Sequence, residues 1–212
     1  MKNIKRLFPL LFAAVVAWQG AVAQETDAAS SPDTLVWCGL DYSMVKMIGT
    51  KDFRKPDDIF PGFLEKWNSL FMTEMFPKVK HLARSVETDT KAVEPGNAKA
   101  NAGCIIREDG SRDEMVNASH ITGQDIAAVV KGYELKSSKG LGLVFIMDRL
   151  VRAQQKGCLY VVFFDISSRK VVYSERLCEK ANGAGFRNYW FNPIKLAVGK
   201  LPRMYQKAVK AP

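Results

Sequence analysis

Apolar residues recur at three- and four-residue steps in three segments, the spacing that lays one face of a helix on a core. The predicted helices cover residues 60–75, 121–133 and 186–199. Pro77 should end the first, because proline lacks a backbone donor. Thr122 and Asp125 have the spacing of a capping box at the start of the second. Pro202 should break or kink the third before a basic tail.

Runs of β-branched and aromatic residues between turn residues predict the strands. The first run covers residues 35–48, with a bend near Gly39. Short polar turns join three later runs, which predicts an antiparallel meander over residues 140–151, 158–165 and 170–178. Two weaker strands are predicted over residues 79–86 and 103–107, on either side of an exposed loop over residues 87–101.

This order of elements indicates an α+β (or α/β) fold. We expect a mixed sheet with a C-terminal three-stranded antiparallel meander and helices packed on the sheet. The length favours a single globular domain over residues 34–212.

The N-terminus has the pattern of an export signal, with basic residues followed by an apolar run and Ala21-Val22-Ala23. We therefore expect residues 1–23 to be a signal peptide and residues 24–33 a flexible lead. The apolar run is shorter than the roughly 20 residues that span a bilayer, so no transmembrane segment is expected in the mature chain. The expected location is periplasmic or secreted.

The formal net charge is +9, and cleavage of the signal would lower it to +6 by removing Lys2, Lys5 and Arg6. The remaining lysines are spread along the chain rather than gathered in a stripe with aromatic residues, which disfavours binding to nucleic acid. An anionic envelope polymer remains a possible partner, and so does an envelope protein. The basic C-terminal stretch, from Lys195 to Lys210, is typical of a solvated face and only sometimes of a surface for acidic polymers.

The four cysteines of an exported chain favour two disulfides. A hairpin turn centred on Ser168 would place Cys158 opposite Cys178, so the bond tests the register of the two strands. Cys38 with Cys104 then follows by elimination. The alternative is that the cysteines are reduced and buried as small hydrophobic residues.

Few residues of the sequence are candidates for catalysis or metal binding. His81 and His120 lie in no motif of a hydrolase, a metalloprotease or a nucleotide-binding loop, so no catalytic residue, metal site or cofactor is predicted. Asp165 most simply opens the turn of the hairpin. Asp41, inside an apolar strand, needs a partner or an edge position, which leaves a structural and a functional role open.

The segment ANGAGFRNYW joins the last predicted strand to the last helix. Exposed amides at a helix start can bind an anion with the help of Arg187, although a flexible turn followed by packing aromatics is the favoured interpretation. The residues predicted for binding are Asp41, Ser43, Arg187, Asn188 and Trp190.

Several phrases resemble a family of exported proteins from Bacteroidota-type bacteria with no assigned activity: LDYSMVKMIG, FLEKWNSLF, GLGLVFIMD, YVVFFDISSRKVVYSER and GFRNYW. In element order the chain is also similar to the envelope module of the curli-secretion lipoprotein, the TolB N-terminal domain and the lipoprotein activators of penicillin-binding proteins. That resemblance implies a helix-covered sheet used for assembly or partner contact, without catalysis.

Together these features favour a non-enzymatic periplasmic domain that binds a protein or an envelope component. The alternative is a small hydrolase-like or ligand-binding protein with a site near Asp41 and Arg187.

Overall fold

A computed structural model of the protein describes residues 34–49, 53, 55–106 and 119–211. The predictions for residues 1–33 lie outside these ranges. Seven strands of the described residues form one sheet: β1 (Thr34–Asp41), β2 (Lys46–Ile48), β3 (Ser85–Thr88), β4 (Ile105–Ile106), β5 (Leu141–Val151), β6 (Lys156–Asp165) and β7 (Val171–Lys180).

The long strand β5 organises the sheet. One edge of β5 pairs in parallel with β1 and then with β2, and these two strands pair in parallel with β3 and β4. The other edge pairs antiparallel with β6, which pairs antiparallel with β7. The mixed α+β class is confirmed. The sheet as a whole is nevertheless not a meander: β5, β6 and β7 are antiparallel, but the half formed by β1 to β4 pairs in parallel, which was not predicted.

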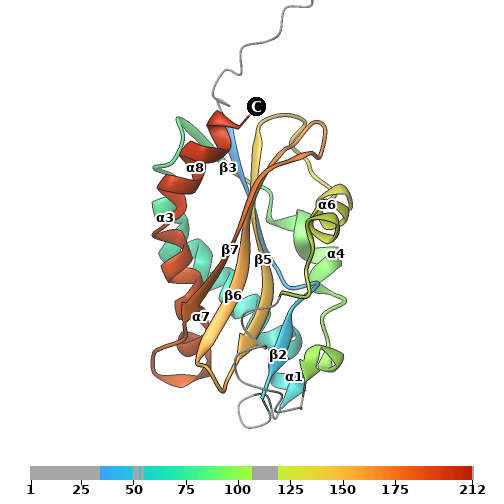
Figure 1. Cartoon of the computed structure of the whole chain (residues 1–212), viewed down its shortest axis with the longest axis vertical. Helices are drawn as coiled ribbons and strands as arrows, with labels where there is room; N and C mark the ends of the chain where they lie inside the picture. Colours follow the sequence, from blue (N-terminus) through green and yellow to red (C-terminus); the bar gives the residue numbers. More distant parts are fainter. Residues whose placement is uncertain (1–33, 50–52, 54, 107–118, 212) are drawn as a thin grey trace, which may run out of the picture.

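Helices cover both faces of the sheet (Figure 1). One face carries α2 (Leu64–Leu70), α3 (Phe76–Val79), α7 (Gly185–Val198) and α8 (Leu201–Lys210), and the short α1 (Pro56–Asp58) precedes α2 with no buried residue. Buried side chains from these helices, such as Trp67 and Trp190, form the larger core cluster. The other face carries α6 (Gly123–Lys131), whose Ile126 and Val130 pack with Phe164 in a second cluster.

The predicted helix starts and ends are only partly right. The capping box of α6 is confirmed, since Thr122 accepts a hydrogen bond from the Asp125 amide and Asp125 accepts one from the Thr122 amide. The predicted helix end at Pro77 is wrong. The turn Phe71–Met75 has π-helical spacing, and Pro77 then lies in the first turn of α3, where a missing N–H costs no helical bond.

A segment expected to be a loop carries regular structure, and the basic C-terminal stretch continues into a second helix. Residues 87–101 are not an exposed loop: they complete β3 and form a 3-10 turn (Thr90–Val93) and α4 (Glu94–Asn97). Ala92 and Val93 are buried there. The helix does break before the basic C-terminus, at Gly199 and Lys200, but the chain is helical again as α8, with Pro202 in its first turn. Hydrophobic burial explains both corrections, because Leu201 and Met204 also bury their side chains against the sheet.

The register predicted for the hairpin is confirmed. Cys158 pairs with Cys178 across β6 and β7, and their sulfurs form a disulfide. The second predicted disulfide is wrong, since Cys38 and Cys104 are free thiols. Cys38 packs in the core cluster beneath α6, whereas Cys104 packs against the cluster on the opposite face. The sheet therefore separates the two thiols.

Candidate binding pocket at the carboxyl end of β1

The edge of β1 is only partly covered by a neighbouring strand. β3 pairs with residues Thr34 to Trp37 of β1 and ends at Thr88, after which the Asp89 amide donates to the Trp37 carbonyl at 2.8 Å. The chain then turns away into the 3-10 turn and α4. Gly39 allows this close crossing, because it has a φ of 111° and a Cβ there would lie 3.0 Å from Val93.

Two asparagine side chains close the part of the β1 edge that β3 leaves open. Asn97 of α4 donates from Nδ2 to the Leu40 carbonyl at 2.9 Å and accepts from the Tyr42 amide at 2.6 Å. Its carboxamide therefore bonds to β1 as a residue of a parallel neighbouring strand would. Asn68 of α2 accepts from the Leu40 amide at 3.3 Å. These bonds satisfy backbone groups that an edge would otherwise expose.

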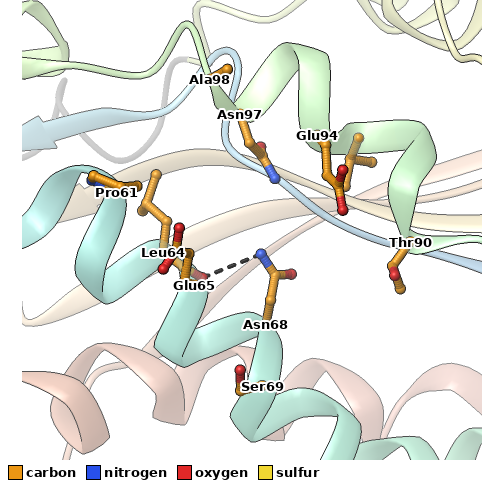
Figure 2. Close-up of a pocket in the computed structure, with 10 residues that line it drawn as sticks. Pro61, Leu64, Glu65, Asn68, Ser69, Thr90, Glu94, Asn97 and Ala98 are labelled. Carbon is orange, nitrogen blue, oxygen red and sulfur yellow. Dashed lines mark hydrogen bonds between the residues drawn. The ribbon is translucent and has the colours of Figure 1, made fainter.

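A cavity of about 490 Å³ lies beside this edge, between α2 and the segment from Thr90 to Ala98. Figure 2 shows side chains from both segments turned toward each other across it. Its lining combines apolar residues with amides, hydroxyls and two carboxylates: Pro61, Leu64, Glu65, Asn68, Ser69, Thr90, Val93, Glu94, Asn97 and Ala98. We call this the β1-edge pocket. It lies where the carboxyl ends of parallel strands meet helices, the usual ligand position in α/β sheets.

Asp41 and Ser43 lie next to this pocket but do not line it. The Asp41 carboxylate is fully buried on the α6 face, where it accepts from the Ser43 amide at 2.8 Å and from the Tyr133 hydroxyl at 2.6 Å. Burial and the neighbouring Asp41 carboxylate hold the pKa of Tyr133 well above its usual value. The partner that a charged residue needs inside an apolar strand is therefore Tyr133, which ties β1 to the end of α6.

Arg187, Asn188 and Trp190 lie on the opposite face. Trp190 is buried and stacks on Phe53, with ring centroids 5.3 Å apart. Arg187 and Asn188 are exposed in the first turn of α7, and the Arg187 side chain donates to Asn188 at 3.1 Å. The sheet thus separates them from Asp41, and no common site forms. The Arg187 carbonyl has a packing role, since it accepts from the Trp67 indole at 2.9 Å.

Sequence reasoning missed an ionic cluster around Asp148. A break in the register between Met147 and Arg149 bulges β5, so that Asp148 and Arg149 both face His120. The buried Asp148 carboxylate lies 3.1 Å from His120 Nδ1 and accepts from Arg176 Nε at 2.7 Å. Because a bulge has no composition signature, only the ladder of strand pairs reveals it.

The geometry gives His120 a structural role. Its Nε2 lies 2.9 Å from the Met44 carbonyl, and its Nδ1 lies 3.3 Å from the Arg149 guanidinium. Burial, with Lys46 nearby, lowers the pKa of His120. The ring contacts the Met44 carbonyl through Nε2, whereas Nδ1 lies between the Arg149 guanidinium and the Asp148 carboxylate. Both ring nitrogens thus contact groups of the fold, which ties the residues after β1 to the bulge of β5.

The basic C-terminal stretch mostly pairs with acidic residues of this chain. Lys195 contacts Glu74 at 3.2 Å, Arg203 contacts Glu175 at 2.6 Å, and Lys200 pairs with Glu179. The pairs to β7 hold α8 on the sheet. This arrangement lowers the charge that the stretch presents to an anionic polymer.

Within the described ranges, no three His, Cys, Asp or Glu side chains are placed to hold a metal ion. The same ranges contain no helix that is both long and apolar enough to cross a bilayer. No protein-family model and no curated protein matches the chain. The family resemblances stated above therefore stay expectations.

Proposed function

We propose that this protein is a non-enzymatic exported domain that binds a protein or an envelope component in the β1-edge pocket. The observation that carries the proposal is the pocket itself, whose two helical walls are tied to β1 by the Asn68 and Asn97 bonds. Ligand sites are usually preformed cavities of this size with a few polar groups on apolar walls.

The lining favours binding over catalysis. It includes Ser69 and Thr90 as hydroxyl groups, but among the described residues no hydrogen bond joins either hydroxyl to Glu65 or Glu94, the two carboxylates that could act as a base. The hydrolase-like alternative required Asp41 and Arg187 to converge, and they lie on opposite faces of the sheet. The Cys158–Cys178 disulfide supports export, because such bonds persist in oxidising compartments.

Blocking the pocket tests the proposal. Ala98 is exposed at the pocket, and Ala98→Trp should fill it, whereas Ala128→Trp places the same ring on the exposed side of α6. Each protein is immobilised and challenged with extract of the cell envelope. We expect the wild type and Ala128→Trp to retain the same component and Ala98→Trp to lose it. Retention of that component by Ala98→Trp would refute binding in the pocket.

Export has a separate test. The amino-terminal sequence of the protein purified from its native cells should begin at Gln24. A protein that keeps Met1 would contradict the proposed export.

A further inference from the structure

The charged groups of the β1-edge pocket all have one sign. Glu65 of α2 and Glu94 of α4 line it, and no lysine, arginine or histidine does. This contrasts with the chain as a whole, whose formal net charge is +9. A pocket of this kind attracts cations and repels anions.

The two glutamates also differ from others on the surface. Glu74, Glu175 and Glu179 each form an ion pair with a lysine or arginine. In the part of the chain that the structure describes, the side-chain carboxylates of Glu65 and Glu94 have no hydrogen bond or ion pair. Lys66, the neighbour of Glu65, instead lies over the Phe63 ring at 4.8 Å from its centroid. Both carboxylates are therefore available to a ligand.

The rest of the pocket defines the body of that ligand. Leu64 and Val93 supply buried apolar surface, and Pro61 and Ala98 extend it toward solvent. Asn68 and Asn97 are already bonded to the backbone of β1, so the pocket does not require an added strand. An alkyl or aryl body would contact the apolar wall while a charged end reaches the glutamates.

Resting on the proposed function, we infer that the ligand of the β1-edge pocket carries an ammonium or guanidinium group on an apolar stem, held between Glu65 and Glu94. Two sources have this chemistry: a free amine and a lysine or arginine side chain of a partner protein. An anionic envelope polymer does not fit this pocket.

Matched probes test the inference. The purified protein is titrated with cadaverine, with N-acetyl-lysine methylamide and with its uncharged analogue N-acetyl-norleucine methylamide, and the amide signals of Leu64, Val93 and Ala98 are followed by NMR. We expect at least one cationic probe to shift these signals and to bind about tenfold more tightly than the norleucine analogue. Tighter binding of cadaverine indicates a free amine, and tighter binding of the lysine compound indicates a protein side chain.

Charge variants complete the test. Glu65→Gln with Glu94→Gln should weaken binding of the cationic probe about tenfold, and higher salt should weaken it in the wild type. Glu134→Gln, which removes an exposed carboxylate outside the pocket, should leave it unchanged.

The inference is refuted if the norleucine analogue binds as tightly as the cationic probes, if no probe shifts the pocket signals, or if the double variant binds like the wild type. The proposed function is judged apart from this result, by whether Ala98→Trp loses the retained envelope component.

Discussion

Replacing Asn97 by alanine should expose how much stability the closed edge of β1 contributes. The substitution removes the hydrogen bonds to the Leu40 carbonyl and the Tyr42 amide, at 2.9 and 2.6 Å, and offers no replacement. A buried backbone group left without a partner costs about 1–3 kcal/mol. Because Asn97 is half-buried, water can reach part of the site. We therefore expect a loss of about 2–3 kcal/mol in the free energy of unfolding.

The assay is urea denaturation, with hydrogen exchange of the Tyr42 amide as a local measurement. Asn97→Ala should lower the midpoint with little change in the slope, and Tyr42 should exchange faster. Gln206→Ala is the control, since Gln206 is exposed on α8 and should change stability by less than about 0.5 kcal/mol. Equal stability of the two variants, with exchange of Tyr42 unchanged, would show that Asn97 does not close the edge.

Three further predictions concern the sulfurs and the ionic cluster. Replacing both Cys158 and Cys178 by alanine removes a cross-link between residues 20 positions apart. The free energy of unfolding, measured by urea denaturation, should fall by about 3 kcal/mol, and an unchanged midpoint would contradict this. The Cys38 thiol is buried with its pKa raised to about 12, so alkylation of the native protein followed by mass spectrometry should modify Cys104 first. Because folding lowers the pKa of His120, the unfolded chain takes up a proton first as the pH falls. Stability should therefore decline below about pH 6.5, and more steeply than in His120→Gln.

The pH prediction depends on all the charges around the ring. Lys46 and Arg149 oppose a positive charge on His120, and Asp148 favours one. If wild type and His120→Gln lose stability in parallel, the ring is not held neutral by its surroundings. Folding measurements at several pH values distinguish the two outcomes.

Features set by neighbours in the chain were predictable. The apolar spacing of α6, its Thr122 and Asp125 cap, and the hairpin of β6 and β7 all depend on residues close in sequence. The Asp165 turn is also confirmed, since its carboxylate accepts from the Ser168 amide at 2.7 Å. In the hairpin one short turn determines every later pair, which is why the register and the Cys158–Cys178 bond followed from sequence.

The pairings between distant segments were not predictable. The parallel contact of β1 with β5 joins strands separated by much of the chain, and no local pattern records it. Elimination paired Cys38 with Cys104, but only the folded sheet reveals that they lie on opposite faces. The pocket is the same kind of feature. Asn68 and Asn97 were unremarkable in sequence and became important because folding brought α2 and α4 to one open strand edge.

The sequence by itself thus determined the local elements, the hairpin register and one disulfide, because short-range hydrogen bonding and periodicity govern them. Tertiary structure alone decided the parallel half of the sheet, the ionic cluster at Asp148 and the β1-edge pocket. These depend on contacts between segments far apart in the chain, whose positions are set only when both faces of the sheet bury their apolar residues together.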